Sequence, residues 1–353
     1  MNSQNSKMQF EDLIDTQPLW LNEEGLSNEI VLSSRIRLAR NLEGYRFPTR
    51  AREKELEDVS ELVKDAVTKS PYFANGLSFK TKHLSQLDIE FVRERHLLST
   101  KKRIVDCVVG KGEIVSVLIN EEDHIRIQCL ASGLNIKAVY PVIFKIDEIL
   151  SSNLTYAFRN DFGYLTSCPT NVGTGMRVSC LLHLPGLVLT KEINKLLDDV
   201  MSRGFSVRGL YGEGSEIEGN FFQLSNQITL GIDEEEIATK TEKEIRNVID
   251  LERETRDKLM REAGERVEDK IWRSYGILKN ARMLSQEEFV NLSSAVRLGI
   301  GIGLIDNTYL KLLNYLLLYT APAHLQKMKG KIMDADTRDI ERANYVREVL
   351  KRT

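Results

Sequence analysis

Apolar residues in the first two thirds of the chain fall into short runs rich in β-branched side chains, with turn residues between them. Such runs predict strands, and two longer segments have the apolar spacing of helices that cover a sheet. The predicted strands are 103–109, 113–120, 125–130, 175–184, 205–210 and 220–231, and the predicted helices are 53–69 and 191–201. Short turns between strands favour antiparallel pairing, so residues 1–232 are expected to form an α+β domain on a largely antiparallel sheet flanked by helices.

The pattern changes after residue 232. Residues 233–282 are rich in charge, contain no proline and place apolar side chains at helical spacing. Capping patterns at Ser285 and Asp336 predict the starts of two further helices, and residues 310–319 predict a buried one. We therefore expect an all-helical domain over residues 233–353. Its apolar faces suit a homodimer, although packing of its own core explains them equally well.

Composition and charge exclude several classes of protein. With 353 residues, of which 42% are hydrophobic, the chain is long enough for two domains with large cores. Forty-nine basic and fifty-two acidic residues leave a net charge of −3, so no global field attracts nucleic acid or an anionic membrane. The longest apolar runs, around 298–305 and 309–319, are shorter than the ~20 residues that cross a membrane. Residues 1–9 are polar and contain no signal core, so cytoplasmic residence is expected.

The four cysteines are too scattered for a disulfide framework or a zinc site, so we expect free thiols in a reducing compartment. Cys107, Cys129 and Cys180 lie within apolar runs and are expected to be inert core residues. Cys168 has polar neighbours and is followed directly by Pro169. It is the one candidate for a functional thiol.

Two short stretches concentrate reactive side chains. Residues 168–177, CPTNVGTGMR, place a thiol and an arginine on either side of a turn of small residues. Residues 120–126, NEEDHIR, place three consecutive carboxylates beside a histidine and an arginine. Acidic and basic groups at this density seldom serve a core. Together the two stretches suggest the two halves of a phosphoryl-transfer site.

Further arginines accompany these stretches. Arg35 and Arg37 alternate with Ile36, so an extended strand would direct both guanidinium groups to one face. With Arg126, Arg177 and Arg208 they form a set that suits phosphate oxygens, because guanidinium groups bind them with two parallel hydrogen bonds and stay charged. Surface ion pairing explains any one of these arginines, but not the whole set beside an acidic cluster.

Common nucleotide-binding motifs do not account for the chain. It contains no Gly-x-x-x-x-Gly-Lys-Ser/Thr sequence. Residues 161–163 are Asp-Phe-Gly but lack the catalytic loop and the lysine strand that accompany this tripeptide in protein kinases. Gly299, Gly301 and Gly303 do not follow a strand, so close packing of helices explains them better than a dinucleotide site. Arginines are therefore the expected phosphate ligands.

An arginine clamp beside glutamates and a thiol suits transfer of a phosphoryl group to a guanidinium group. This acceptor is cationic and a poor nucleophile, so carboxylates must hold it in line and accept its proton. Glu122 is the candidate base, and Glu213 or Glu216 could brace the other edge of the acceptor. Cys168 as a thiolate would position the acceptor electrostatically; a buried thiol at a turn is the structural alternative. Mg²⁺ and the arginines would neutralise the transferring group.

These motifs resemble those of the phosphagen kinases, the family of arginine and creatine kinases. That family carries Ser-Arg-x-Arg, Asn-Glu-Glu-Asp-His-x-Arg and Cys-Pro-Thr-Asn-x-Gly-Thr in the same order, and the match covers about residues 25–232. The resemblance implies a phosphagen-kinase-like fold with ATP as donor, Mg²⁺ carried by ATP, no resident metal, and His96 against the adenine. The catalytic residues that it implies are Glu121, Glu122, Cys168 and Glu213. The ATP-binding residues that it implies are Ser33, Ser34, Arg35, Ile36, Arg37, His96, Arg126, Arg177, Val178, Ser179, Cys180, Leu181, Arg208, Gly209, Leu210, Tyr211, Gly212 and Glu213.

Two features differ from kinases of small guanidino compounds. Those kinases have a helical domain ahead of Ser-Arg-x-Arg, which begins here at residue 34, and an arginine where this chain has Tyr211. Both features are similar to the bacterial protein-arginine kinases, and this likeness extends over nearly the whole chain. It implies phosphorylation of arginine side chains in proteins, including the kinase itself. In that branch of the family the modification marks proteins for the ClpC–ClpP protease and inactivates the heat-shock repressor CtsR, with McsA as activator.

The last predicted helix carries Arg338, Asp339, Arg342 and Ala343. Arg338 and Arg342 are four residues apart and share a helix face. Two guanidinium groups for a phosphate and a carboxylate for a guanidinium suit phosphoarginine, and the resemblance implies an allosteric phosphoarginine site here. An Asp339–Arg342 ion pair on a solvated helix is the structural alternative. Two other functions stay open: a kinase for free arginine or a similar metabolite, and a non-catalytic phosphoarginine-binding adaptor, against which the intact Glu122 and Cys168 argue.

Overall fold

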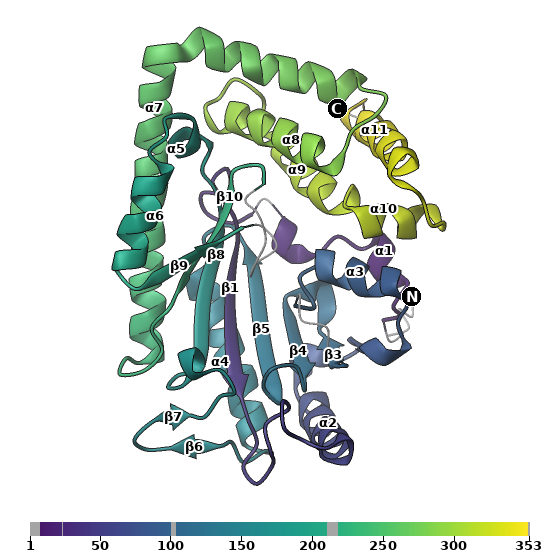
Figure 1. The fold of residues 1–353 in the computed structure, drawn as a ribbon, viewed down its shortest axis with the longest axis vertical. Coiled ribbons are helices and arrows are strands. Elements are labelled where there is room, and N and C mark those ends of the chain that lie inside the picture. The colour runs from purple at the N-terminus through teal and green to yellow at the C-terminus, as the bar shows by residue number, and fades with distance from the viewer. Residues whose placement is uncertain (1–7, 23, 100–103, 210–217, 352–353) are drawn as a thin grey trace, which may run out of the picture.

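The computed structural model describes residues 8–22, 24–99, 104–209 and 218–351 (Figure 1). At its centre is an eight-stranded sheet in the order β2-β3-β4-β5-β1-β8-β10-β9, and all its described pairings are antiparallel. The strands are β1 (Val31–Arg40), β2 (Leu77–Lys80), β3 (Asp106–Val109), β4 (Val115–Ile119), β5 (Ile125–Ser132), β8 (Met176–His183), β9 (Phe205–Arg208) and β10 (Phe221–Asn226), with a separate hairpin of β6 (Phe158–Arg159) and β7 (Gly163–Tyr164). The predicted antiparallel sheet is confirmed.

Alternation of side chains along β1 separates the two faces of the sheet. Ile36 and Leu38 are fully buried in the main hydrophobic cluster, whereas Arg35 and Arg37 lie on the opposite face. The helices that contribute to the core on the hydrophobic face include α2 (Glu53–Thr68), α4 (Ile136–Ser151), α6 (Ile193–Ser202) and the first half of α7 (Glu234–Asn280). On the opposite face, apolar packing occurs in two regions, one around Phe91 and Leu118 and the other around Leu32, Phe221 and Tyr319. The polar remainder of that face is left for a site.

The C-terminal helices form a second hydrophobic cluster. Helix α7 runs along one edge of the sheet and then bends over the other C-terminal helices (Figure 1), with a non-helical conformation at Ala263 (φ −144°, ψ 27°). Before the bend, Ile245 packs with the sheet; after it, Ile271 packs with the other helices. These helices are α8 (Gln286–Gly301), α9 (Thr308–Tyr319), α10 (Pro322–Lys329) and α11 (Ala335–Lys351). The helical C-terminal region is confirmed, and the change of core falls inside α7; the domain boundary at residue 232 stays a prediction.

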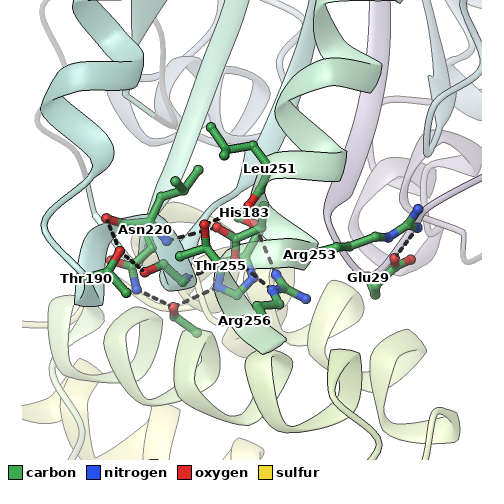
Figure 2. Close-up of polar contacts among 12 residues, drawn as sticks. Glu29, His183, Thr190, Asn220, Leu251, Arg253, Thr255 and Arg256 are labelled. Atoms are coloured by element: carbon green, nitrogen blue, oxygen red, sulfur yellow. Dashed lines mark hydrogen bonds and ion pairs between the residues drawn. The ribbon is translucent and has the colours of Figure 1, made fainter. Parts of the chain in front are cut away.

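A buried polar network fixes α7 to the sheet. The carboxylate of Glu252 accepts hydrogen bonds from the backbone N–H groups of Gly186 (2.9 Å) and Leu187 (3.0 Å), at the start of α5 (Pro185–Leu189), and pairs with Arg256 Nε at 2.6 Å. Arg256 also donates to the carbonyl of His183, the last residue of β8. Figure 2 shows Arg256 directed at His183. The network couples the position of α7 to the end of a strand that carries candidate site residues.

A second contact fixes the same helix on its outer side. Arg253 of α7 forms an ion pair with Glu29 at 2.7 Å (Figure 2), just before β1. Burial of Arg256 and Glu252 makes the inner pair the stronger constraint, since exposed pairs are screened by solvent. Both contacts tie α7 to segments that flank β1 and β8.

Of the three glycines expected to serve helix packing, Gly299 and Gly301 do so, whereas Gly303 has φ +78° and, among the described residues, open space where a Cβ atom would lie. A Cβ atom at Gly299 would lie 2.6 Å from Ile271 Cγ2, and one at Gly301 would lie 2.4 Å from Arg256 Nη1. Close approach of α8 to α7 therefore requires glycine at both positions. At the last helix the prediction is off by two residues: Asp334, and not Asp336, accepts a hydrogen bond from the Thr337 N–H (2.8 Å).

The four cysteines are unpaired by disulfides. Cys107, Cys129 and Cys180 are buried, and burial raises the pKa of Cys129 and of Cys180 to about 12. These three thiols therefore stay protonated, as expected of core residues. No helix in the described part of the chain is long and apolar enough to cross a membrane.

Candidate active site

A cleft of about 500 Å³ lies on the polar face of the sheet. Side chains of the central strands form its floor, and the acidic turn after β4, the Cys168 loop, the end of α3 (Gln86–Glu94) and the starts of α8 and α10 form its walls. Pairing of Arg40 with Ile125 and of Leu38 with Met176 places the acidic turn and the Cys168 loop at the same end of β1. The C-terminal helices lie beyond the other end of β1 (Figure 1). The cleft connects these two ends.

Five arginines from four strands line this cleft. Arg37 on β1 lies directly opposite Arg177 on β8, and Arg35 lies two residues away on the same face. Arg126 on β5 is opposite Ala39 on β1, and Arg208 on β9 is opposite Gln223 on β10. All five guanidinium-bearing side chains contribute to the cleft wall. The alternation read from the sequence therefore brings them to one surface.

The arginines create an excess of buried positive charge. Burial, with the charges of Arg126, Arg177 and Arg208, lowers the pKa of Arg35 to about 10, and burial together with Arg35 also lowers the pKa of Arg37 well below its ordinary value. The buried Nε atoms of Arg35 and Arg126 have no hydrogen-bond partner within the described residues. Guanidinium groups stay protonated at physiological pH, so they cannot relieve the mutual repulsion by losing a proton. A bound polyanion would both neutralise them and accept their hydrogen bonds.

The three consecutive carboxylates of the acidic turn have different environments. Glu121 is buried and accepts hydrogen bonds from Arg126 Nη1 (2.5 Å) and from the Ser99 hydroxyl. Asp123 is buried as well, whereas Glu122 is only half-buried where it lines the cleft. Glu121 therefore holds an arginine in place, and Glu122 is the carboxylate best exposed to a ligand.

Asp123 joins the acidic turn to the loop that carries Cys168. Its Oδ1 atom accepts hydrogen bonds from the Ser167 backbone N–H and from Asn41 Nδ2, both at 2.6 Å. Asn41 in turn accepts from the His124 N–H at 2.9 Å, so the end of β1 takes part in the same network. This network fixes the thiol relative to Glu122.

Further contacts hold the Cys168 loop against Thr229 and β1. The Cys168 thiol and the Thr170 hydroxyl lie 3.0 Å apart, and the side chain of Cys168 is half-buried in the cleft wall. The Thr229 hydroxyl donates to the carbonyls of Thr170 (3.0 Å) and Val172 (2.8 Å). Gly175 has φ +61°, and a Cβ atom there would lie 2.5 Å from the Ala39 carbonyl oxygen. Glycine thus allows the loop to pass close to β1.

His96 lies in the cleft in a constrained conformation. Its φ is +58°, its carbonyl accepts a hydrogen bond from Gln128 Nε2 (2.9 Å), and its ring packs edge-on against Trp20. Burial and the charges of Arg35 and Arg37 lower the pKa of His96 to about 3. The imidazole is therefore neutral and suited to contact with an uncharged aromatic ring.

Comparisons with known proteins agree with this geometry. The family model for the ATP:guanido phosphotransferase C-terminal catalytic domain matches residues 58–255, and the one for the protein-arginine kinase McsB C-terminal domain matches residues 264–353. A protein-arginine kinase of Geobacillus stearothermophilus is 42% identical over 338 residues, covering 94% of this chain and 93% of the relative. One from Bacillus subtilis (strain 168) is 40% identical, covering 95% and 94%. The chain belongs to the protein-arginine kinase family of ATP:guanido phosphotransferases.

Solved structures show the same fold. The duplicated taurocyamine kinase of Schistosoma mansoni with bound transition-state-analogue components superposes with a TM-score of 0.60 at 24% identity, covering 68% of this chain and 35% of that one. Lombricine kinase superposes with a TM-score of 0.58 at 22% identity, covering 69% and 76%. The fold is thus that of the phosphagen kinases. The two family models meet between residues 255 and 264, where α7 bends at Ala263.

The structure of this guanido phosphotransferase gathers part of the predicted site. The predicted residues that line the cleft are Arg35, Arg37, His96, Glu121, Glu122, Arg126, Cys168, Arg177 and Arg208. Ser34, Ile36, Val178 and Cys180 point to the opposite, hydrophobic face, because they alternate with the arginines along β1 and β8. Ser33, Ser179, Leu181 and Gly209 are not among the residues that line the cleft. Leu210, Tyr211, Gly212, Glu213 and Glu216 lie outside the described residues.

Several cleft residues were not found from the sequence. Ser99 and Gln128 act through contacts made by strand pairing and turn geometry, which motif spacing does not reveal. Asp123 is recognisable as part of the acidic cluster, but its hydrogen bond to the Cys168 loop is not. Glu94 and Gln286 come from helices far apart in the chain. In the sequence, each is recognisable only as a polar residue at the end of a helix, which is a weak indication of a site.

The predicted phosphoarginine residues lie on α11, outside the cleft lining. Arg342 is buried: its Nε donates to the Thr320 carbonyl (2.9 Å), and its Nη1 donates to the Leu284 carbonyl (2.7 Å) and pairs with Asp339 (2.6 Å). Arg338 Nη1 donates to the Met333 carbonyl at 2.8 Å. The helix ion pair considered from the sequence is therefore present, but it is not on a solvated surface.

The described side chains of the cleft suit a phosphate group and not a resident metal ion. Within residues 8–22, 24–99, 104–209 and 218–351, no group of three or more His, Cys, Asp or Glu side chains is arranged to hold a metal ion. The cleft instead presents the Nε–H groups of Arg35 and Arg126, which bond to no described residue. These groups fit the phosphate oxygens of a nucleotide, which could themselves carry a cation.

Proposed function

We propose that this enzyme transfers the γ-phosphoryl group of ATP to arginine side chains of proteins, including its own. The observation that carries the proposal is the cleft in which five arginines lie beside Glu122 and Cys168. One surface thus offers ligands for a polyphosphate and, at the same end as the acidic turn, ligands for a cationic acceptor. Few reactions other than guanidine phosphorylation need both.

The arginines would hold the donor. The buried Nε–H groups of Arg35 and Arg126, which have no partner within the described residues, would bind phosphate oxygens, and the charge of all five arginines would stabilise the transferring group as the bond to ADP breaks. Mg²⁺ would enter on the ATP phosphates and neutralise part of their charge. We therefore assign the donor side to Arg35, Arg37, Arg126, Arg177 and Arg208, with His96 against the base.

The carboxylates and the thiol would hold the acceptor. A nitrogen of the substrate guanidinium attacks the γ-phosphorus, the bond from that phosphorus to the leaving ADP oxygen breaks, and the nitrogen's proton passes to the carboxylate of Glu122. Glu121 would position Arg126, and Cys168 would fix the acceptor electrostatically. Glu213 or Glu216 would supply the second carboxylate, a role that lies outside the described residues.

Two observations support a protein as acceptor. The curated relatives over nearly the full chain are protein-arginine kinases, and the McsB C-terminal model matches residues 264–353. The alternative acceptor is free arginine or another small guanidino compound. A non-catalytic adaptor is a weaker alternative, because the cleft keeps its carboxylates, thiol and arginines together.

We also propose that α11 binds phosphoarginine as an allosteric ligand through Arg338, Asp339, Arg342 and Ala343. Arg342 contacts the carbonyls of Leu284 and Thr320, just before α8 and α10, so a ligand at Arg342 would act on two helices whose first residues line the cleft. In cells we expect cytoplasmic residence and a homodimer. We expect CtsR as a substrate, McsA as an activator, and delivery of marked proteins to ClpC–ClpP.

Incubation with γ-labelled ATP and either casein or free arginine tests the acceptor. We expect label in the protein, stable in base and lost in acid, because the product is a phosphoramidate. Label that appears only in the small molecule would contradict the protein-kinase proposal. Absence of transfer to either acceptor would favour the adaptor.

A further inference from the structure

Gln286 is the first residue of α8, and its side chain lines the cleft although it belongs to the helical C-terminal region. Its amide nitrogen and oxygen are both buried, and neither has a hydrogen-bond partner within the described part of the chain. A buried amide without partners is costly, because it loses its hydrogen bonds to water. Beside an open cleft, this arrangement indicates a group that is completed by a ligand.

The backbone around Gln286 is held firmly. The Leu284 N–H donates to the Asp339 carbonyl at 3.0 Å, and the Leu284 carbonyl accepts from Arg342. The Ser285 side chain caps α8 by accepting from the Glu288 N–H at 3.1 Å. Gln286 is therefore presented to the cleft by a fixed helix start and does not depend on a loop.

The contacts of Arg342 also show which elements lie beside Gln286. Arg342 also binds the carbonyl of Thr320, two residues before Pro322, which lines the cleft. Glu94 accepts hydrogen bonds from the Ala323 and His324 N–H groups, both at 2.7 Å. Glu94 lies two residues before His96, and both line the cleft. Gln286 thus belongs to the wall formed by α3, α8 and α10.

This wall and the reacting groups lie toward different ends of β1. The acidic turn and the Cys168 loop are at the Arg40 end, whereas the C-terminal helices lie beyond the start of β1 (Figure 1). Arg35 and Arg37 lie between them. If the γ-phosphate of ATP faces Glu122 and the phosphate chain crosses these arginines, the base reaches the wall that contains Gln286.

We propose that Gln286 recognises the adenine of the nucleotide, with its amide oxygen accepting from the 6-amino group and its amide nitrogen donating to a ring nitrogen. A primary amide matches an adenine edge in this bidentate way. The inference rests on ATP being the donor in the proposed function. It makes Gln286 a specificity-determining residue that the helical C-terminal region supplies to the catalytic cleft.

Calorimetry with ADP and with purine riboside 5′-diphosphate, which lacks the 6-amino group, tests this pairing. The wild-type enzyme should prefer ADP by roughly two- to tenfold, the value of one hydrogen bond. Gln286→Met, which keeps the side-chain volume, and Gln286→Ala should both bind the two nucleotides equally. The exposed neighbour variant Glu287→Ala should keep the wild-type preference. In turnover assays KM for ATP should rise in the Gln286 variants while kcat stays unchanged.

Two results would overturn the inference: a wild-type enzyme without preference, or Gln286 variants that keep it. Equal weakening of both nucleotides with the preference retained also counts against it, because the amide would then support the wall without reading the base. Failure of the wild-type enzyme to bind either nucleotide would instead contradict the proposed function itself.

Discussion

Glu122 is distinguished from its neighbours by what surrounds them. All three carboxylates line the cleft, but Glu121 is buried against Arg126 and Ser99 and Asp123 against Ser167 and Asn41, whereas Glu122 is half-buried. A carboxylate that accepts a proton from a substrate must reach the substrate. The two flanking carboxylates would then act indirectly, by positioning an arginine and the Cys168 loop.

Replacement of Glu122 by glutamine tests this assignment. Glu122→Gln keeps the side-chain shape but cannot accept the proton at neutral pH, so kcat should fall by roughly 10²–10⁴-fold while ADP still binds with wild-type affinity. Glu57→Gln, an exposed change on α2, is the matched control and should leave kcat unchanged. Wild-type turnover in Glu122→Gln would show that another group accepts the proton.

At the residue scale, the sequence identifies site residues whose placement follows from neighbouring positions in the chain. Arg35, Arg37 and Glu122 could be selected because alternation on a strand and clustering in a turn are visible in the chain itself. Gln286 could not be selected from the sequence, because it reaches the cleft only where Arg342 holds the start of α8 in place. Val178 and Cys180 were included with Arg177 by family resemblance, yet the strand alternation turns Cys180 and Val178 to the core.

At the scale of elements, the packing of α8 on α7 depends on small residues. Gly299 lets α8 approach Ile271 closely, and Gly301 leaves room for Arg256, which also bonds His183 at the end of β8. The helix pair thereby joins the C-terminal cluster to the sheet. A shift of α8 along α7 would move both this junction and Gln286.

Alanine at two glycines separates packing from helix propensity. Gly299→Ala should lower the free energy of unfolding by about 1–3 kcal/mol, because its Cβ atom would lie 2.6 Å from Ile271 Cγ2. Gly276→Ala, in the open part of α7 with nothing within 4 Å, should raise it by about 0.5–1 kcal/mol. Urea denaturation followed by circular dichroism measures both. If Gly299→Ala raised the free energy of unfolding as much as Gly276→Ala does, α8 would not pack closely on α7 at Gly299.

Elements were predictable where the pattern was regular. Helix 53–69 and the strands around Val117 and Ile127 follow from periodicity and lie where expected. Helix α4 was missed because Pro141 interrupts an apolar run, yet the run packs as one helix on β1 and β5. The bend at Ala263 could not be foreseen, since it depends on which cluster each half of α7 joins.

At the scale of the whole molecule, the cleft is built by both parts of the chain. The sheet supplies the arginines, Glu122 and Cys168, while the starts of α8 and α10 complete the wall near Glu94. If the nucleotide binds in this cleft as proposed, its affinity should depend on the position of the C-terminal helices. This arrangement gives α11, which contacts the start of α8 and the segment before α10 through Arg342, a direct route to the cleft.

Mass spectrometry after incubation with ATP, Mg²⁺ and a protein substrate tests the central claim most directly. The account predicts phosphoryl groups on arginine side chains of the substrate and of the enzyme, absent when Glu122→Gln replaces the wild-type enzyme. Samples must be kept out of acid, because the nitrogen–phosphorus bond is acid-labile. Phosphate confined to hydroxyl-bearing side chains, or to added free arginine, would contradict the claim.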